Sequence, residues 1–435
     1  MSVRETGVDG KELLGWVKKA NNFLIDARPI DAFNGWAMKG EPRGGHIHGA
    51  LSFPLSWLEY NDWLDILEDK NISKGSSIVV YGYDWGETEF LGEKLVEAGY
   101  DDVSVYNHFF EWSSDSNLPL ERLPRYEKLV YPEWVKILVD GGRPPSYESN
   151  EFVIGHASYG FREDYEKGHI PGAIHIDTLS LEDPKTWNRR SPEELERALL
   201  GYGITSDTTV ILYGRYSHPN NRDPYPGMNA GHLAAMRCAV IMLYAGVNDV
   251  RILNGGLNRW EAEGYSLTTD EGKIRKAEDF GVEIPAHPEY IIDTPEAKQL
   301  LASHGELVSV RSWDEYIGNV SGYNYISKKG RIPGSIFGNN GSDAYHMENY
   351  RNLDNTMRQY TEIAENWAEN HIIPEKHVAF YCGTGWRASE AFLNAYLMTW
   401  PHISIYDGGW FEWSSDENNP IETGIPQNTV FEPET

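Results

Sequence analysis

The stretch His377-Val-Ala-Phe-Tyr-Cys-Gly-Thr-Gly-Trp-Arg-Ala-Ser389 sets the fold that we expect for the whole chain. Its apolar start, Val378 to Tyr381, predicts a short buried strand, and apolar residues recur at helical spacing after the loop. Gly383 and Gly385 allow a sharp turn, since glycine adopts a positive φ at little steric cost. Cys382 is therefore expected on a loop between the end of a strand and the start of a helix.

A loop of this kind can activate a cysteine. Successive backbone N–H groups can converge into an anion-binding cradle, and the following helix adds the partial positive charge of its N-terminus. Both effects favour the thiolate, which is the nucleophilic form. The pattern indicates a cysteine nucleophile in a small anion site. The alternative is a buried structural cysteine, which does not require the Gly-Thr-Gly that follows Cys382.

The composition limits the classes of partner. The 435 residues suit about three domains of roughly 150 residues each. Lys and Arg total 38 against 66 Asp and Glu, a formal charge of −28. Nucleic acids and anionic membrane surfaces are bound by basic proteins, so we expect neither as a partner. Any anion site must then be built locally.

Cysteine usage and apolar stretches limit the location. Cys238 lies in an apolar helical pattern and is expected in a core, so the chain is no disulfide scaffold. No uncharged apolar stretch of about 18 residues predicts a membrane span. The chain as written begins without an apolar signal segment, and we expect a cytoplasmic protein. A periplasmic protein whose leader had been removed would begin in the same way.

Three sequence elements recur three times in the same order. They are a Gly-x-Ile-x-Gly element followed by a small residue, an apolar strand that ends in Tyr before a loop, and a second strand followed by a turn and a Trp. The strand-and-loop copies are Ile78-Val-Val-Tyr-Gly82, Val210-Ile-Leu-Tyr-Gly214 and Val378-Ala-Phe-Tyr-Cys382. Alternating strands and helices predict an α/β fold with a mainly parallel sheet flanked by helices in each repeat. Each loop would lie at the carboxyl edge of its sheet, where such folds bind ligands.

The repeats predict three domains, at residues 1–126, 127–277 and 278–435. Gly82 and Gly214 stand where the third repeat has Cys382. Glycine offers no nucleophile, so we expect the first two domains to be inactive and to support the structure, shape the cleft or recruit partners. The second and third repeats also carry insertions, at residues 217–227 and 318–330.

These motifs resemble the rhodanese (sulfurtransferase) family over essentially the whole chain. The matching segments are Asp26-Ala-Arg28, Gly168-His-Ile-Pro-Gly-Ala173, the loop that begins at Cys382, and Tyr406-Asp-Gly-Gly-Trp410. A cysteine loop in the last unit only is similar to the bacterial three-domain thiosulfate sulfurtransferases of this family. The resemblance implies that Cys382 takes the outer sulfur of thiosulfate as a persulfide, releases sulfite, and passes the sulfur to cyanide or a thiol, a protein thiol included. Such two-step transfer is ping-pong and needs no cofactor.

The resemblance also implies the residues that bind substrate. The backbone N–H groups of the loop would stabilise the thiolate and the persulfide, as in an oxyanion hole. Trp386 would line the cleft or pack against a neighbouring domain, and Arg311 would add positive potential. The full set of expected substrate-binding residues is Gly383, Thr384, Gly385, Trp386, Arg387 and Arg311. We expect no metal, because the histidines of the repeated element have an arginine, Arg331, in the third copy.

The Asp-x-Arg element departs from the family pattern in two repeats. It reads Gly155-His-Ala157 in the second repeat and Ser309-Val-Arg311 in the third, where Glu315 follows. In the family this element belongs mostly to the scaffold. The departures therefore bear on local stability more than on activity.

Three other functions remain open. A sulfur-relay protein would carry the persulfide to a protein partner and use the two inactive repeats as binding surfaces. A mercaptopyruvate sulfurtransferase typically has a Cys-Gly-Ser-Gly-Val-Thr loop, which differs from the loop of this chain. A tyrosine-phosphatase-type enzyme needs five residues between Cys and Arg, whereas four separate Cys382 from Arg387. The shorter loop makes a tighter cradle, suited to a sulfur atom more than to a phosphate.

Overall fold

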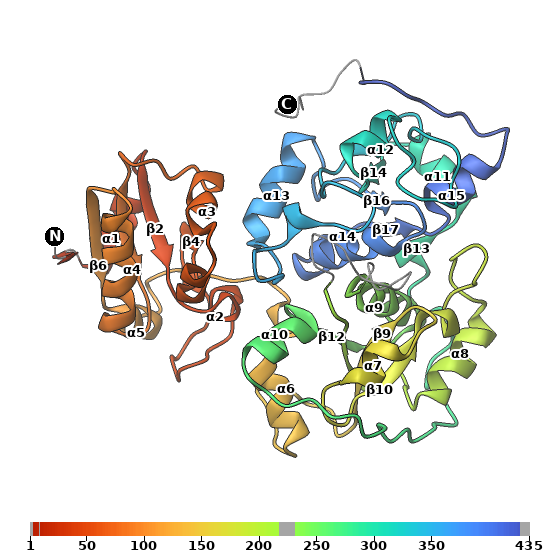
Figure 1. Ribbon diagram of the computed structural model, residues 1–435, viewed down its shortest axis with the longest axis horizontal. Coiled ribbons are helices and arrows are strands. Elements are labelled where there is room, and N and C mark those ends of the chain that lie inside the picture. Colours follow the sequence, from red (N-terminus) through yellow and green to blue (C-terminus); the bar gives the residue numbers. More distant parts are fainter. Residues whose placement is uncertain (1–2, 8, 217–230, 427–435) are drawn as a thin grey trace. The chain divides into compact units, whose positions relative to one another are not determined.

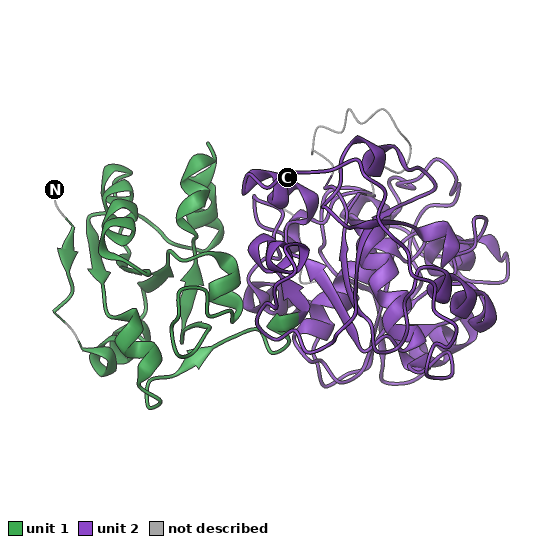
Figure 2. Cartoon of the chain, turned by 90° about the horizontal axis from the view of Figure 1, so that it is seen from below, with its two compact units in different colours: residues 1–127 green, residues 128–435 purple. Residues whose placement is uncertain are grey.

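The computed structural model describes residues 3–7, 9–216 and 231–426 (Figure 1). The insertion expected at residues 217–227 lies outside the described residues. The chain divides into two compact units, residues 1–127 and 128–435 (Figure 2). The first unit holds the first repeat and the second unit holds the other two. A domain boundary at 277/278 stays a prediction.

The first repeat forms a five-stranded parallel sheet in the order β1-β6-β5-β2-β4. Successive strand residues alternate between two apolar cores, because each face of the sheet is covered by helices. The strands are β1 (Arg4–Glu5), β2 (Asn22–Asp26), β4 (Ala50–Ser52), β5 (Ser77–Tyr81) and β6 (Asp102–Tyr106), with β3 (His46–Ile47) and β7 (Leu120–Glu121) forming a separate antiparallel pair. The helices are α1 (Gly10–Val17), α2 (Ile30–Asn34), α3 (Trp63–Asp69), α4 (Trp85–Glu97) and α5 (Phe109–Ser114).

The second repeat has the same arrangement, with the sheet order β10-β9-β11-β12-β8 and parallel pairing throughout. Its strands are β8 (Leu129–Val130), β9 (Phe152–Ser158), β10 (Ile174–Asp177), β11 (Thr209–Tyr213) and β12 (Asp249–Leu253). Its helices are α6 (Pro132–Val139), α7 (Glu163–Lys167), α8 (Pro192–Gly201), α9 (Leu233–Ala245) and α10 (Gly256–Ala262). Cys238 is buried in α9, as a core cysteine should be.

The third repeat has the corresponding order β13-β17-β16-β14-β15, again parallel. Its strands are β13 (Ile291–Ile292), β14 (Glu306–Ser309), β15 (Ile336–Phe337), β16 (Val378–Tyr381) and β17 (Ile403–Tyr406). Its helices are α11 (Thr294–Leu301), α12 (Trp313–Ile317), α13 (Tyr360–Glu369), α14 (Trp386–Leu397) and α15 (Gly409–Ser415). The α/β class predicted from the repeats is confirmed in all three.

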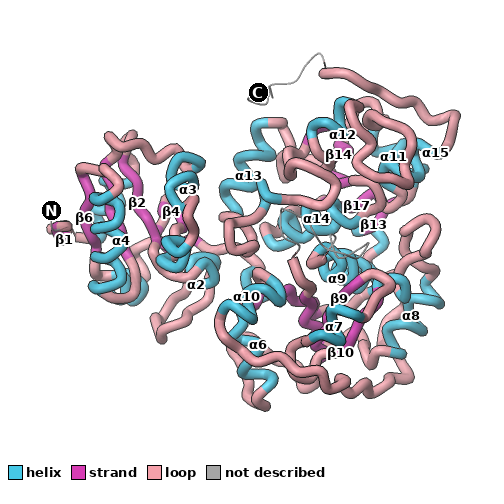
Figure 3. Tube along the Cα trace, in the orientation of Figure 1, coloured by secondary structure: helices cyan, strands magenta, loops and turns pink. Residues whose placement is uncertain are grey.

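Helices α9 and α14 lie side by side inside the second unit (Figures 1 and 3). Helix α9 contacts β9, β11 and β12, and α14 contacts β16 and β17. Every residue of both helices is buried. A helix with no exposed face belongs between two layers, and these two helices form the shared core between the sheets of the second and third repeats. Within the described residues, no helix has the length and hydropathy needed to cross a membrane.

Candidate active site

Cys382 follows β16 directly and lies on the loop of residues 382–387, which leads into α14. Its side chain is fully buried. Gly385 has a φ of 88° and forms the N-cap of α14, so the turn uses the conformation that glycine tolerates best. The predicted strand, loop and helix are therefore all present.

The start of α15 fixes the direction of the loop peptides. The amide N–H of Trp410 donates to the carbonyl of Cys382 at 2.8 Å, and that of Phe411 donates to the carbonyl of Gly383 at 3.0 Å. Gly409 permits this approach, because a Cβ there would lie 2.7 Å from the Gly383 oxygen. In a trans peptide the N–H points away from the C=O. The N–H groups of the next two loop residues therefore point away from α15, as an anion cradle requires.

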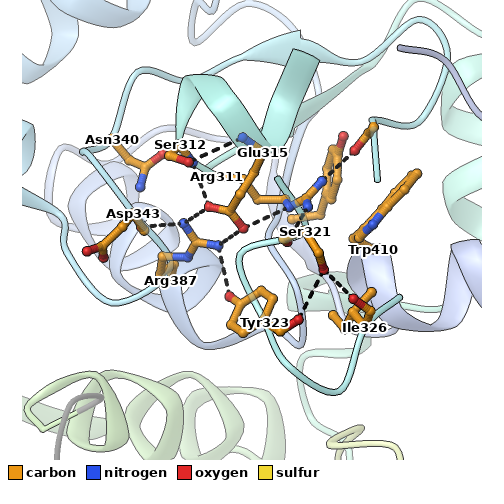
Figure 4. Close-up of polar contacts among 12 residues, drawn as sticks. Arg311, Ser312, Glu315, Ser321, Tyr323, Ile326, Asn340, Asp343, Arg387 and Trp410 are labelled. Atoms are coloured by element: carbon orange, nitrogen blue, oxygen red, sulfur yellow. Dashed lines mark hydrogen bonds and ion pairs between the residues drawn. The ribbon is translucent and has the colours of Figure 1, made fainter. Parts of the chain in front are cut away.

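Arg387 is held in place by protein groups (Figure 4). Its two terminal nitrogens each donate to a Glu315 carboxylate oxygen at 2.9 Å, a bidentate ion pair. They also donate to the Asp343 carbonyl at 2.9 Å and to the Tyr323 hydroxyl at 2.8 Å. The Nε atom is buried and has no hydrogen-bond partner in the described part of the chain. Nε is thus the one guanidinium nitrogen of Arg387 that the described residues leave unpaired.

Arg311 shares the same carboxylate. Its Nε lies 3.3 Å from Glu315 Oε1, and its terminal nitrogens donate to the carbonyls of Gly330 at 2.6 Å and Ser321 at 3.1 Å (Figure 4). Burial alone would raise the pKa of Glu315, but Arg387 and Arg311 together hold that pKa below its usual value. One ionised carboxylate therefore links Arg311 of the scaffold to the arginine of the cysteine loop.

Two tyrosines that the sequence analysis did not select lie against the cysteine loop. Both belong to the insertion at residues 318–330. A Cβ on Gly383 would lie 2.3 Å from the Tyr323 ring, so this ring sits directly on the loop backbone. Tyr325 lies near Thr384, whose side chain lowers the pKa of the Tyr325 phenol by less than burial raises it. Burial raises the pKa of both phenols, and the charge of Cys382 raises it further, so both are neutral hydrogen-bond donors.

Further aromatic rings extend this surface. Trp187 of the second repeat stacks on Tyr325, with ring centroids 4.7 Å apart, and meets Phe411 edge-on at 5.2 Å. Tyr345 meets Tyr323 edge-on at 6.3 Å. In the sequence, the only indication of these two tyrosines is the Tyr-Asn-Tyr of the insertion, and an insertion loop does not by itself suggest contact with the cysteine. The cysteine loop is thus bordered by an aromatic surface that consists of Trp187, Tyr323, Tyr325, Tyr345 and Phe411.

Trp386 joins the cysteine loop to the second repeat. Its indole N–H lies 3.0–3.1 Å from both carboxylate oxygens of Glu182, and its ring meets Tyr159 edge-on at 5.6 Å. The structure therefore brings the expected residues 382–387 together around Cys382, with Arg311 behind them. Direct contact of these residues with a substrate stays a prediction.

Lys329, His46 and His48 are bonded to groups outside the cysteine loop. Lys329 donates to the Asn319 carbonyl at 2.7 Å. His46 has its Nδ1 2.8 Å from the Phe33 carbonyl, and His48 pairs with Glu121. Across residues 3–7, 9–216 and 231–426, no three His, Cys, Asp or Glu side chains are grouped as a metal site requires.

Comparisons with known proteins match this architecture. The rhodanese-like domain family matches residues 9–115, 160–263 and 293–416. The thiosulfate sulfurtransferase YnjE of Escherichia coli is 40% identical over 421 residues, which cover 94% of this chain and 91% of that protein. The sulfur carrier protein TtuD of Thermus thermophilus is 27% identical over 323 residues, covering 68% of this chain and 97% of that protein.

Solved structures are also similar over nearly the full length. An anaerobic ergothioneine biosynthesis enzyme from Chlorobium limicola, in complex with its natural substrate trimethyl histidine, is 51% identical, with a TM-score of 0.94 and coverage of 98% of this chain and 100% of that one. A variant of EanB, with a cysteine persulfide in a tetrahedral intermediate state with ergothioneine, is 52% identical, with a TM-score of 0.94 and coverage of 97% and 100%. The chain belongs to the rhodanese-like family and is a sulfurtransferase built from three rhodanese-like repeats.

Proposed function

We propose that this sulfurtransferase carries a sulfane sulfur as a Cys382 persulfide and delivers it to the ring carbon of an imidazole betaine of the trimethylhistidine type. The similar solved structures, which hold trimethyl histidine or ergothioneine, support this class of acceptor. They are more similar to this chain, at 51–52% identity, than the thiosulfate sulfurtransferase is at 40%.

The aromatic surface beside the cysteine loop is the observation that carries this proposal. Quaternary ammonium groups bind over the faces of aromatic rings, because the ring quadrupole attracts a cation that has no N–H to donate. Tyr323 and Tyr325 bring such rings to the cysteine, and Trp187 extends them.

The proposed chemistry has two steps. In the first, the Cys382 thiolate attacks the outer sulfur of a donor such as thiosulfate, the S–S bond of the donor breaks, and sulfite leaves with the electron pair. In the second, the terminal sulfur of the persulfide adds to the ring carbon between the two imidazole nitrogens, and the ring nitrogen that receives the C=N electron pair takes up a proton from water. That carbon then loses its proton to water, the C–H electron pair forms the C=S bond, and the persulfide S–S bond breaks to return the Cys382 thiolate.

The residues of the cradle match the charges that develop in these steps. The N–H groups of Gly383 and Thr384 would stabilise the persulfide anion and the departing thiolate. The Tyr323 oxygen accepts from Arg387, which leaves the phenol proton free to donate into the site. Electrostatic support of this kind is worth most where water is excluded, and Cys382 is fully buried.

A second candidate is transfer from thiosulfate to a thiophilic acceptor such as cyanide, a small thiol or a protein thiol. Two observations favour it. The relative that matches 94% of the chain is named a thiosulfate sulfurtransferase, and Arg387 brings a positive charge to the cysteine loop, which suits an anionic donor. The sulfur carrier among the relatives supports the protein-thiol form of this candidate.

The test is a loading and discharge experiment followed by intact mass. The protein is incubated with thiosulfate, desalted, and then given trimethylhistidine, cyanide or a thiol. We expect one added sulfur atom in the wild type and in Cys238→Ala, and none in Cys382→Ser. Trimethylhistidine should remove the added sulfur and appear as its thione in the small-molecule fraction.

The outcomes separate the candidates. Discharge by cyanide or thiols, with trimethylhistidine left unchanged, would establish the second candidate in place of the first. Loading by polysulfide but not by thiosulfate would exclude thiosulfate as the donor and leave the acceptor proposal standing. Loading of Cys382→Ser would overturn Cys382 as the carrier.

A further inference from the structure

An arginine of the second repeat is built into the support of the third repeat's cysteine loop. Arg237 lies in α9 and is fully buried. Its Nε donates to Glu182 Oε2 at 3.0 Å, and its Nη2 donates to Asp407 Oδ1 and to the Trp187 carbonyl, each at 2.7 Å. The three groups come from both repeats of the second unit, with Arg237 as the central cation.

Both carboxylates that Arg237 binds are attached to the cysteine loop. Glu182 accepts the indole N–H of Trp386, the first residue of α14. Asp407 begins residues 407–411, the segment whose amides bind the carbonyls of Cys382 and Gly383. The helix side and the α15 side of the loop are therefore both fastened to the same guanidinium.

Arg237 also touches the loop directly. A Cβ on Gly385 would lie 2.9 Å from Arg237 Nη1, so the guanidinium packs against the one loop residue with a left-handed backbone. Nη1 is buried and has no hydrogen-bond partner among the residues that the structure describes. A buried guanidinium nitrogen left without an acceptor is costly, so its position against Gly385 is imposed by the surrounding network.

We infer that Arg237 is a positioning residue for sulfur transfer, through which the second repeat, whose own loop has no cysteine, holds the persulfide loop of the third. It fixes the backbone around Gly385 and thereby aims the loop N–H groups at the sulfur of Cys382. The inference rests on the proposed role of Cys382 as the sulfur carrier and is independent of the acceptor. It assigns the second repeat a function that its own loop, with Gly214, does not provide.

The test compares two buried arginines of the second repeat. Arg251 is a matched control, since it is also buried, also pairs with an aspartate, Asp249, and bonds to the Ser146 carbonyl of its own repeat. The Arg237→Lys and Arg251→Lys variants keep the charge and lose the planar fork. Both are made in a Cys238→Ala background, in which Cys382 is the only thiol.

Two properties are measured on the full chain: the rate of persulfide formation and the pH profile of Cys382 alkylation. We expect Arg237→Lys to slow loading by about tenfold or more, because a loop displaced by about 1 Å loses its alignment. The alkylation profile should shift to higher pH, since misaligned N–H groups stabilise the thiolate less. Arg251→Lys should leave both properties unchanged at a comparable loss of melting temperature.

Unchanged alkylation and loading in folded Arg237→Lys would overturn the inference. So would a loss of rate that only follows the unfolded fraction. If Arg237→Lys does not fold, Trp386→Phe provides the test, because it removes the bond to Glu182 and leaves Arg237 in place. It should shift the profile in the same direction by a smaller amount. Should the wild type fail to load any sulfur, the proposed function fails while the alkylation profile still decides the role of Arg237.

Discussion

The first and third repeats use one arginine position in different ways. In the first repeat, Arg28 forms a closed pair with Asp26, with Nε–Oδ1 at 2.9 Å and Nη2–Oδ2 at 2.7 Å. Its Nη2 also donates to the Gly45 carbonyl at 2.7 Å, and the guanidinium lies 3.6 Å from the centre of the Phe109 ring. This pair ties β2 to the neighbouring loops, and glycine follows the central strand.

In the third repeat the arginine keeps its place and changes its anion. Arg311 donates to the Gly330 carbonyl and lies over the Trp410 ring at 5.1 Å, as Arg28 does over Phe109. The aspartate of the first repeat is replaced by Ser309, and the carboxylate comes from Glu315 at the start of α12.

The change of anion connects the scaffold to the chemistry. Because Glu315 approaches from α12, it can bind Arg311 and Arg387 at once, whereas Asp26 binds a single arginine. In the third repeat, which has the cysteine, the departure from Asp-x-Arg brings in a carboxylate that also holds Arg387 of the cysteine loop. An element that belongs to the scaffold in the first repeat has become part of the site in the third.

Neutralising Glu315 in the third repeat and Asp26 in the first should separate the scaffold role from the role in the site, with the largest effects that we expect. Glu315→Gln leaves two buried arginines without a carboxylate, so we expect a loss of about 3–5 kcal/mol in unfolding free energy and a hundredfold or greater loss in the rate of persulfide formation. Asp26→Asn should destabilise the first unit by a similar amount and leave that rate unchanged. Urea unfolding and single-turnover loading measure the two effects.

Equal loading by Glu315→Gln and the wild type would show that Arg387 does not need this carboxylate. A loss of loading in folded Asp26→Asn would contradict the separation of scaffold from site.

Rebuilding the first-repeat arrangement in the third repeat should restore stability without activity. In Ser309→Asp/Glu315→Gln, the new carboxylate stands at the Asp26 position and can pair with Arg311 but not with Arg387. We expect recovery of about 1–3 kcal/mol relative to Glu315→Gln, the range for a hydrogen-bonded charged group. Loading should remain at least tenfold below the wild type.

Full recovery of loading in the double variant would mean that any buried carboxylate near Arg311 suffices. The approach of the carboxylate from α12 would then have no special importance for Arg387.

The sequence predicted the parts of this site that depend on local patterns. The strand before Cys382, the glycine turn and the helix after it follow from spacing alone, as do the three parallel sheets. The binding of Glu315 to Arg387 was not predictable, because 72 residues separate them and their approach depends on sheet order. The Tyr323 contact with the loop depends in the same way on how an insertion folds back.

Arg237 shows what sequence reasoning can still recover. It is the one charged residue in the apolar run from Leu233 to Ala245, and a buried charge requires a partner. The sequence therefore predicts that Arg237 pairs with a carboxylate. It does not predict which carboxylate, because Asp407 lies 170 residues away in another repeat.

Tyrosine hydroxyls near the two arginines provide a smaller comparison. In the third repeat, the Tyr323 hydroxyl accepts a hydrogen bond from Arg387 at 2.8 Å. In the first repeat, Arg28 lies 5.2 Å from the centre of the Tyr83 ring, and the Tyr83 hydroxyl donates to Glu41 at 2.5 Å. Tyr323→Phe should slow discharge of the persulfide by about tenfold, a typical effect of one lost hydrogen bond to a charged group. Tyr83→Phe should leave discharge unchanged. The rate at which the loaded protein loses its persulfide sulfur to the acceptor is measured for both variants. Equal rates would show that Tyr323 takes no part in the transfer.

The smallest expected effect is a pH-dependent contact behind Arg387. The Asp343 carbonyl accepts from Arg387, and its side chain lies 2.7 Å from His346 Nδ1. The hydrogen bond to Asp343 raises the pKa of His346 above its usual value. Burial by itself would raise the pKa of Asp343, but His346 holds it below its usual value. Both shifts favour the ion pair in the folded chain.

The signs of these two shifts fix the pH window. A histidine whose folded pKa is raised contributes stability below its unfolded pKa of about 6.5 and loses it as the pH rises through the folded value. The aspartate contributes above its unfolded pKa of about 3.9 and loses this as the pH falls. The pair should therefore stabilise the third repeat most near pH 5 to 6.

Since half of the Asp343 side chain is exposed, the ion pair with His346 contributes at most about 1 kcal/mol to stability. His346→Gln should lower the melting temperature by about 1–2 °C at about pH 5.5 and have no effect at about pH 9. An equal effect at both pH values would show that packing, and not the ion pair, orders this segment behind Arg387.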